Sequence, residues 1–344
     1  MELTLRPQNR TVPLAPGRPV LESALAARLN LPHSCRAGSC GSCRAHLIAG
    51  RVSYPRGRPL GLSDAEAAAG DVLLCQAVPA TDLVVEAREV QRVTDVEIKA
   101  LPCRVARLER LAPDVMALYL RLPAVEEFRF RAGQYLDVML AGGRRRSFSI
   151  ASPPHDAALI ELHVRRVEGG EFTERVFGSL APGALLRIEG PLGQFVYREP
   201  AEPATAGPLL LVAGGTGFAP LKAILRQLLE SGVRRRLHLY WGARHEADLY
   251  QDAWLREQVA RYPGLSYVPV LSMASAAESA RYRCGLVHEA LLADFAALAP
   301  AEVYAAGPPA LIAALRATLP ARGLAPERLY FDSFDYAPDA RPAR

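Results

Sequence analysis

The sequence lacks any run of about 18 uncharged apolar residues, the length that a helix needs to cross a bilayer. Its first residues, Met1-Glu2-Leu3-Thr4-Leu5, have neither the basic region nor the apolar region of a secretory signal. It also lacks blocks of lysine and arginine interleaved with aromatic residues, which are typical of nucleic-acid-binding proteins. We therefore expect a cytoplasmic protein that contacts neither a membrane nor nucleic acid.

Cysteine is scarce, with six residues in 344, but four of them have an informative spacing. Cys35, Cys40 and Cys43 form a C-x4-C-x2-C sequence, and Cys75 follows after 31 intervening residues. This is the spacing of a plant-type [2Fe–2S] cluster, in which four thiolates hold two irons. Five of the six residues between these three cysteines are small, as a loop that wraps closely around a cluster requires: Ala37, Gly38, Ser39, Gly41 and Ser42.

Other cysteine sites fit this pattern less well. A structural zinc site would more naturally read C-x2-C twice. A Rieske centre replaces two cysteines by histidines, but His33 and His46 do not stand in Cys-x-His pairs. A disulfide framework belongs to small secreted domains. We expect the two remaining cysteines, Cys103 and Cys284, to be small buried side chains.

The cysteine pattern makes residues 1–90 resemble the ferredoxin domain of iron–sulfur flavoprotein reductases, which implies a β-grasp fold. Residues 91–100 are expected to be a linker. Residues 101–200 contain short alternating strands separated by glycine and proline, which indicates an antiparallel β-barrel. Residues 205–344 alternate strands with helices, which predicts a doubly wound α/β domain. The expected fold class is thus multidomain, α+β and α/β.

The barrel segment carries a flavin motif. Arg146-Ser147-Phe148-Ser149 matches the R-x-[YF]-S signature of the ferredoxin–NADP⁺ reductase superfamily, and Gly133-Gln134-Tyr135 matches its G-Q-Y strand. The resemblance implies that Arg146 pairs with the flavin pyrophosphate, that Phe148 packs beside the cofactor, and that Ser149 hydrogen-bonds near flavin N5. The resemblance favours FAD over FMN, because the FMN branch has its iron–sulfur domain at the carboxyl end.

A second part of the flavin site is expected at Gly170 and Thr173. Here two glycines and a hydroxyl open a probable helix, and the N–H groups of a helix start can bind phosphate. The full set of cofactor-binding residues predicted in this domain is Tyr135, Arg146, Ser147, Phe148, Ser149, His163, Arg165, Gly170 and Thr173.

The third domain carries a nucleotide motif. The sequence G-G-T-G-F-A-P at residues 214–220 lies between a buried strand and a helix, where glycines allow a pyrophosphate to approach the helix start. It resembles the superfamily's nicotinamide-nucleotide motif, and A-A-G-P-P at residues 305–309 resembles its C-G-P-P motif, with Ala306 in place of the cysteine. The predicted residues are Gly214, Gly215, Thr216, Gly217, Pro220, Gly307 and Pro308.

The adenosine ribose is expected at the end of the next strand, near Arg244. Arg244 could accommodate a 2′-phosphate, whereas Glu246 or Asp248 could bind a free 2′-hydroxyl. We favour NADH, with NADPH as the alternative. Residues 330–334 resemble the carboxyl-terminal aromatic segment of the superfamily, which implies that Phe334 covers the flavin with Asp332 nearby. Ser149, Asp332 and Phe334 are the residues expected to act in catalysis.

The resemblance implies a monomeric enzyme that passes electrons from NADH through FAD and the cluster to a protein acceptor. Residues 166–173 resemble the reductase components of naphthalene-dioxygenase-type oxygenases, which feed a small Rieske-type ferredoxin or a terminal oxygenase. Residues 186–191 resemble CDP-6-deoxy-glucoseen reductases equally well. We favour the oxygenase reductase. A non-enzymatic iron–sulfur redox sensor is the more distant alternative. Such a protein would need neither the nucleotide motif nor the flavin motif that this sequence contains.

Overall fold

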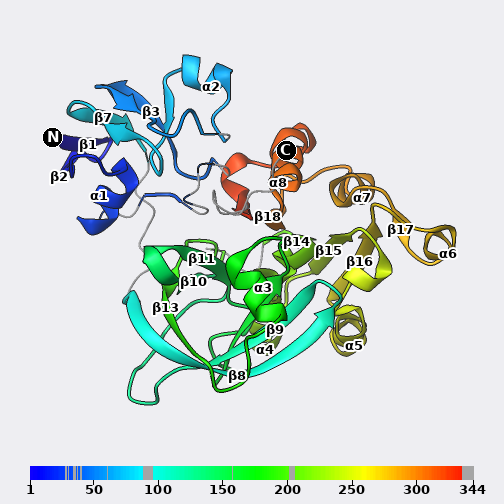
Figure 1. Cartoon of the computed structure of the whole chain (residues 1–344). Helices are drawn as coiled ribbons and strands as arrows, with labels where there is room; N and C mark the ends of the chain where they lie inside the picture. Colours follow the sequence, from blue (N-terminus) through cyan, green and yellow to red (C-terminus); the bar gives the residue numbers. More distant parts are fainter. Residues whose placement is uncertain are drawn as a thin grey trace. The chain divides into compact units, whose positions relative to one another are not determined.

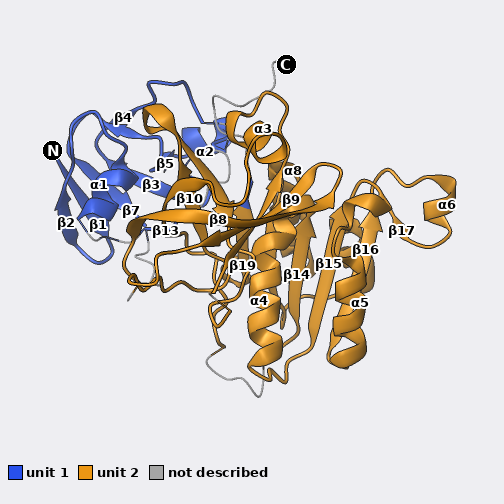
Figure 2. Ribbon diagram, turned by 60° about the horizontal axis from the view of Figure 1, so that its bottom comes forward, with its two compact units in different colours: residues 1–95, 333–338 blue, residues 96–332, 339–344 orange. Residues whose placement is uncertain are grey.

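The computed structural model describes residues 1–27, 29, 31–33, 36, 38, 41–59, 61–87, 96–156, 158–200 and 206–334. The chain divides into two compact units (Figure 2). The first contains residues 1–95 and 333–338, and the second contains residues 96–332 and 339–344. Within the described ranges, every helix is too short or too polar to cross a bilayer.

The first unit is built on a five-stranded sheet with the order β2-β1-β7-β3-β5. Its first two strands form an antiparallel hairpin, and β1 then pairs in parallel with β7. Its elements are β1 (Glu2–Arg6), β2 (Arg10–Pro13), α1 (Val20–Ala26), β3 (Arg44–Ala49), β4 (Val52–Ser53), α2 (Asp64–Ala68), β5 (Asp71–Leu73), β6 (Val78–Pro79) and β7 (Leu83–Glu86).

This unit has a core of its own. Leu3 and Leu5 alternate inward from β1, and they belong to one buried cluster with Leu21 and Ala24 of α1. The helix α2 starts with a capping box, S-D-A-E at residues 63–66. There, Ser63 Oγ accepts from the Glu66 N–H, and Glu66 Oε2 accepts from the Ser63 N–H. The fold is the β-grasp arrangement of a ferredoxin domain.

The first half of the second unit is an antiparallel sheet with the order β11-β10-β13-β8-β9-β12. A bridge between Ile150, directly after β11, and Leu162 of β12 joins the two edge strands and closes the barrel. β8 starts at Lys99, inside the range that we expected to be linker. The elements are β8 (Lys99–Ala112), β9 (Val115–Arg121), β10 (Tyr135–Met139), η1 (Ala141–Gly143), β11 (Arg145–Ser149), β12 (Ile160–Arg165), α3 (Glu171–Phe177) and β13 (Leu185–Leu192).

The second half is a six-stranded sheet with the order β17-β16-β15-β14-β18-β19, in which β14 pairs in parallel with both β15 and β18. Its elements are β14 (Leu209–Gly214), η3 (Gly215–Gly217), α4 (Phe218–Glu230), β15 (Leu237–Ala243), η4 (Glu246–Asp248), α5 (Asp252–Arg261), β16 (Leu265–Leu271), α6 (Ala276–Ser279), β17 (Arg283–Cys284), α7 (Val287–Asp294), β18 (Glu302–Gly307), α8 (Pro309–Thr318), η5 (Pro320–Arg322), η6 (Pro326–Arg328) and β19 (Leu329–Ser333).

Helices cover both faces of this sheet (Figure 1). Leu210 and Val212 of β14 pack in one buried cluster with residues of α7 and α8. Strand alternation therefore turns Leu209 and Leu211 to the opposite face, where α4 packs against β14. Such a doubly wound sheet leaves the carboxyl ends of its strands open for a ligand, because the strand order reverses direction at β14.

The two cysteines outside the cluster motif differ from each other. Cys103 on β8 is buried, as expected, and burial raises its thiol pKa to about 12. Cys284 on β17 is exposed, so the expectation of a buried side chain was wrong there. Its strand is two residues long and lies at the sheet edge, where packing against a second layer is limited.

Candidate functional site: a cysteine loop, a flavin strand and a nucleotide corner

Two of the four predicted cluster ligands lie within the described residues, and both are buried and free of disulfides. Cys35 and Cys40 lie outside the described residues. The antiparallel register pairs Arg44 with Leu73, and the Leu74 N–H donates to the Cys43 carbonyl at 3.1 Å. This pairing carries Cys75, which is separated from Cys43 by 31 intervening residues, to the end of the cysteine loop.

Two further contacts tie the cysteine loop to the segment around Cys75. The Gln76 side-chain amide donates to the Arg36 carbonyl at 2.7 Å. Gly38 has φ +79, and a Cβ there would lie 2.8 Å from side-chain atoms of Gln76 and of Pro59. The loop therefore approaches this segment too closely for a larger residue. Buried cysteines on converging segments fit a thiolate-bound cluster.

The predicted flavin residues lie on two paired strands. The register of β10 and β11 places Tyr135 opposite Ser149 and Asp137 opposite Ser147. Tyr135 and Ser149 are both buried. Gly193 has φ +89, and a Cβ there would lie 2.8 Å from the Tyr135 ring, so only glycine lets this ring lie against the backbone.

Strand alternation divides the four residues of the R-x-F-S motif. Arg146 and Phe148 share one face of β11, while Ser147 and Ser149 share the other. The Phe148 ring lies 5.4 Å from the Phe172 ring, which anchors α3. The Ser147 hydroxyl donates to Asp137 at 2.6 Å and is thereby occupied within the protein. Phe148 also packs against the barrel core, and the flavin roles assigned to Arg146 and Phe148 stay predictions.

The turn before α3 is braced by Thr173. Its buried hydroxyl accepts from the Val167 N–H and lies 3.1 Å from the carbonyls of Val167 and Gly170, either of which can take its proton. A Cβ on Gly170 would lie 2.6 Å from this oxygen. The hydroxyl thus shapes the turn, and a phosphate bound here would meet the backbone N–H groups of the turn. That role for Gly170 and Thr173 stays a prediction.

The two glycine motifs of the α/β domain meet at the carboxyl ends of β14 and β18. A Cβ on Gly217 would lie 1.9 Å from the Ala306 carbonyl, and a Cβ on Gly214 would lie 2.7 Å from Pro308. Gly307 has φ +154, and its Cβ position is 3.0 Å from the Gly214 backbone. Close backbone approach thus requires glycine at 217 and 307, and the Pro308 ring requires it at 214. We call this place the nucleotide corner (Gly214–Gly217 with Gly307 and Pro308).

Arg165 supplies a positive charge beside the nucleotide corner. Its guanidinium lies 3.4–3.7 Å from the position that a Gly215 Cβ would occupy. Its Nε and Nη2 are buried, and among the described residues they have no hydrogen-bond partner, although Nε lies 3.7 Å from an Asp114 carboxylate oxygen. Buried donors are normally satisfied. These two donors, next to a glycine turn at a helix start, fit the pyrophosphate of a dinucleotide.

Arg244 is held by carboxylates. Its Nε and Nη2 donate to the two oxygens of Asp248 at 2.9 and 3.1 Å, and Nη2 also donates to Asp114 at 3.3 Å. Glu246 pairs with Arg281 and accepts from the Tyr282 hydroxyl at 2.9 Å. The end of β15 therefore presents an arginine whose charge is already matched by acidic groups.

Three predicted residues remain, namely His163, Asp332 and Phe334. His163 of β12 is buried, and both of its ring nitrogens contact protein groups, Glu161 and Tyr250. Asp332 is buried at the end of β19, and Phe334 follows this strand at intermediate exposure. The catalytic roles assigned to Ser149, Asp332 and Phe334 stay predictions.

Sequence reasoning missed a group of polar residues around His163, namely the buried Glu161 and Lys222 and the partly buried Tyr250. One signal was available: Lys222 interrupts an otherwise apolar stretch of α4, and Glu161 and His163 alternate with apolar residues in β12. Charged residues are rarely buried unless they are paired. A lysine and a glutamate on apolar elements could thus have been predicted as partners.

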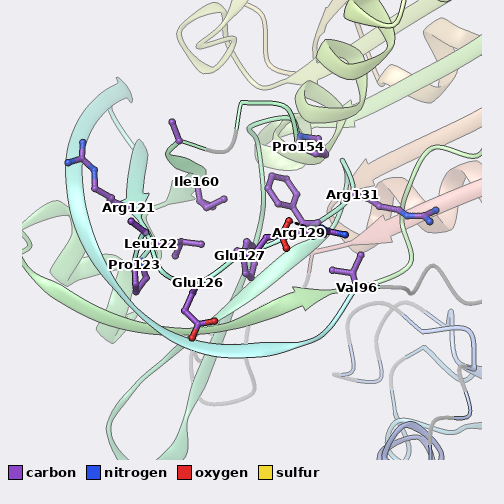
Figure 3. Close-up of a pocket in the computed structure, with 14 residues that line it drawn as sticks. Val96, Arg121, Leu122, Pro123, Glu126, Glu127, Arg129, Arg131, Pro154 and Ile160 are labelled. Atoms are coloured by element: carbon purple, nitrogen blue, oxygen red, sulfur yellow. Dashed lines mark hydrogen bonds and ion pairs between the residues drawn. The ribbon is translucent and has the colours of Figure 1, made fainter.

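A separate cavity of about 770 Å³ lies at the other end of the barrel, lined mainly by residues 121–131. Apolar side chains, including Phe128 and Ile160, form part of its wall, and Figure 3 shows Glu127 and Arg129 turned toward each other at 2.6 Å. None of the predicted cofactor-binding residues lines it. Both of its carboxylates are paired within the protein, Glu127 with Arg129 and Glu126 with Lys99.

Comparison with known families divides the chain into three matches. Residues 3–80 match the family described as 2Fe-2S iron-sulfur cluster binding domain. Residues 102–197 match the oxidoreductase FAD-binding domain, and residues 211–317 match the oxidoreductase NAD-binding domain. The chain therefore contains the three domains that the sequence motifs indicated, and the cofactors are a [2Fe–2S] cluster, FAD and NAD(P)H.

Similar proteins extend over nearly the whole chain. A CDP-6-deoxy-L-threo-D-glycero-4-hexulose-3-dehydrase reductase of Yersinia pestis is 35% identical over 315 residues, covering 92% of each chain. The terephthalate 1,2-dioxygenase reductase component 2 of Comamonas sp is 36% identical over 326 residues, covering 95% of each. The crystal structure of the Amycolatopsis cytochrome P450 reductase GcoB matches with a TM-score of 0.78 and 34% identity, covering 97% of this chain and 98% of that one.

The cysteine loop generates a first prediction. Replacing Cys75 by Ser should abolish cluster iron and acid-labile sulfide, because one of four thiolates is lost, while FAD content is unchanged. NADH oxidation by an artificial acceptor that draws electrons directly from the flavin should persist. Cys103→Ser, at a buried cysteine outside the loop, is the matched control and should keep the iron. Full iron content in Cys75→Ser would contradict the ligand assignment.

The nucleotide corner generates a second prediction. Gly217→Ala places a methyl group against the Ala306 carbonyl, so the turn must shift and the pyrophosphate seat opens. Nucleotide affinity measured by titration calorimetry should fall at least tenfold, about 1.4 kcal/mol, with the cluster spectrum unchanged. Gly264→Ala is the control, because its nearest neighbour would be 3.8 Å away. Equal affinity in both variants would show that the nucleotide binds elsewhere.

Proposed function

The chain belongs to the iron–sulfur flavoprotein reductases of the ferredoxin–NADP⁺ reductase superfamily, and we propose that it serves an aromatic-ring-hydroxylating system. It is an NAD(P)H-dependent oxidoreductase with an iron–sulfur, a flavin and a nucleotide domain. In this proposal it takes electrons from NADH and delivers them to a terminal oxygenase or to the small Rieske-type ferredoxin that supplies one.

The order of the carriers follows from how many electrons each can handle. NADH gives two electrons together as a hydride and the cluster takes one at a time, so FAD, which can do both, must stand between them. The protein supplies binding, orientation and electrostatics for these groups. Its second unit therefore has to bring a nucleotide held at the nucleotide corner to a flavin held along β10 and β11.

The residues near the nucleotide corner suit the first part of that task. Glycine backbone and the start of α4 form the pyrophosphate seat, and the two buried donors of Arg165 point to the same anion. Ala306, at the position of the family's cysteine, is fully buried and offers only a methyl group. We propose that hydride transfer here relies on the geometry of the bound groups, with no thiol beside the nicotinamide.

The acceptor is proposed from the similar proteins. The terephthalate dioxygenase reductase matches along 95% of both chains, and the cytochrome P450 reductase shares the fold along nearly its whole length. The first is named as the reductase component of a dioxygenase and the second as a cytochrome P450 reductase. This end-to-end match is the observation that carries the proposal. The dehydrase reductase of Yersinia pestis, at 35% identity over 92% of each chain, supports a second candidate, delivery to a CDP-deoxysugar dehydrase.

We propose NADH as the preferred donor. A 2′-phosphate near Arg244 would face Asp248 and Asp114, which already share this guanidinium, and the Glu246 carboxylate nearby in sequence. The hydrogen bonds that Arg244 donates to Asp248 are the main reason that the pKa of Arg244 is raised. A neutral ribose hydroxyl adds no negative charge to this group. The electrostatics therefore favour the unphosphorylated nucleotide.

The acceptor proposal predicts the outcome of a parallel assay. Under anaerobic conditions and with NADH, the purified reductase should reduce a Rieske-type ferredoxin of an aromatic oxygenase rapidly. An iron–sulfur deoxysugar dehydrase should be reduced at least tenfold more slowly. Faster reduction of the dehydrase would move the protein to the second candidate function. A purified protein that contains no flavin would contradict the enzymatic assignment itself.

The nucleotide proposal predicts the effect of Asp248→Asn. This change keeps the side-chain shape but removes one negative charge, so Arg244 becomes available to a 2′-phosphate. The ratio of kcat/KM for NADPH to that for NADH should rise at least tenfold, or about 1.4 kcal/mol. Asp252→Asn is the matched control, because Asp252 also pairs with an arginine four residues away, on α5. An unchanged ratio would place the ribose away from Arg244.

A further inference from the structure

The outer face of β12 is unusually polar for a buried strand. Leu162 and Val164 belong to the barrel core, so alternation turns Glu161, His163 and Arg165 to the opposite face. Each of these three residues contacts the α/β domain, within the same compact unit. The strand thus connects the flavin-binding half of the unit with its nucleotide-binding half.

Glu161 is the centre of these contacts. Its Oε1 accepts from Lys222 Nζ of α4 at 2.7 Å and from His163 Nε2 at 2.9 Å, and the Tyr119 hydroxyl lies at 3.4 Å. The Glu161 and Lys222 side chains are only 6% and 9% exposed. Burial by itself would raise the pKa of Glu161, but the hydrogen bond from His163 and the charge of Lys222 outweigh it and lower this pKa to about 2.

His163 extends the network toward the nucleotide corner. Burial lowers the pKa of His163, so its ring is neutral at pH 7. Since Nε2 donates to Glu161, Nδ1 is the acceptor for the Tyr250 hydroxyl at 3.1 Å. The Tyr250 ring meets Trp241 edge-on at 5.0 Å, and the Trp241 indole N–H donates to the Gly215 carbonyl at 2.9 Å.

The barrel strand therefore reaches the nucleotide corner in three ways. Arg165 lies directly beside Gly215, and the chain of contacts through His163 ends on the carbonyl of the same glycine. Lys222 holds α4, which begins directly after the glycine turn. Because the three contacts come from alternate residues of one strand, a shift of that strand would move all of them together.

We call the contact between β12 and α4 the junction. It depends on a buried ion pair between Glu161 and Lys222. A buried ion pair adds little net stability compared with apolar side chains of the same volume, whereas removing one partner is costly. Hydrogen bonds with fixed partners permit only one arrangement of strand and helix, while apolar contacts tolerate sliding. The junction thus restricts how the two halves can lie relative to each other.

We propose that Glu161, His163, Lys222 and Tyr250 form an interlock whose role is to position the bound nucleotide against the flavin. They are positioning residues, since their described contacts are with one another and with neighbouring protein groups. The inference rests on the proposed function, because it concerns the step in which hydride passes between the two bound groups. That step requires reacting atoms about 3–3.5 Å apart, and a misplacement of about 1 Å can slow a reaction about 100-fold.

The test uses the holoenzyme with Lys222→Met, which keeps the length of the side chain and removes its charge. Flavin reduction by NADH in a stopped-flow instrument should slow at least tenfold, with a larger isotope effect for NADH deuterated at the transferred position. The Kd of NAD⁺ by calorimetry should change less than threefold. Arg226→Met is the control, because Arg226 joins the same helix to barrel residue Asp156 through an exposed pair. Its rate should stay within twofold of the wild type.

A second variant separates positioning from stability. Lys222→Met with Glu161→Gln removes the uncompensated carboxylate and should restore the thermal midpoint, but flavin reduction should remain slow because the helix contact is still missing. Wild-type rates in this double variant would overturn the proposal. A Lys222→Met variant in which NAD⁺ affinity and the rate of flavin reduction fall by the same factor would also overturn the proposal.

If the proposed function were wrong, the result would differ from the results that overturn the interlock. In that case the wild type itself would not reduce its flavin with NADH. The interlock is then tested by hydrogen exchange of the backbone amides. Exchange in the glycine turn and α4 should accelerate in Lys222→Met and remain normal in Arg226→Met, and equal exchange in both would overturn the interlock.

Discussion

At the carboxyl ends of β14 and β18 the backbones lie so close together that no side chain fits between them. The rest of the second unit depends on this constraint. Parallel pairing carries β14 directly beside β18, and at their carboxyl ends the backbone of Gly217 meets the Ala306 carbonyl where a Cβ would be 1.9 Å away. This contact fixes where α4 starts. It therefore also fixes the direction of the N–H groups that a pyrophosphate would meet.

The same contact fixes the position of Lys222, which follows one turn later on α4, and so determines which barrel residues can reach the helix. Glu161 and His163 stand at the matching positions of β12. The flavin strands β10 and β11 belong to the same closed barrel as β12 through the Ile150–Leu162 bridge. Packing at one glycine thus sets the geometry of the nucleotide, the junction and the flavin strand in turn.

The sequence contained enough information for the domains and for the local motifs. Cysteine spacing, glycines between a strand and a helix, and the capping box at Ser63 are short-range patterns, and each one specifies a local geometry. The family matches and the strand orders agree with them. The meeting of residues 214–217 with 307–308 could also be expected, because adjacent parallel strands end at one edge.

The features that sequence reasoning missed depend on contacts between elements. Nothing near His163 in sequence shows that its ring contacts Tyr250, because Tyr250 comes from another domain, 87 residues away. The engagement of Ser147 by Asp137 depends on the register of two strands. Cys284 is exposed because its short strand lies at a sheet edge, which composition does not reveal.

The similar proteins also indicate where acceptor choice resides. A dehydrase reductase and a dioxygenase reductase resemble this chain almost equally, at 35% and 36% identity over more than 90% of each chain. Features common to all three belong to the shared machinery of cofactor binding and electron transfer. Acceptor choice must then depend on residues that differ between them without disturbing cores, caps or glycine contacts. Exposed positions satisfy this condition, because substitutions there usually change stability by less than about 0.5 kcal/mol. The buried interlock and the nucleotide corner can therefore remain constant while the surface that meets the acceptor diverges.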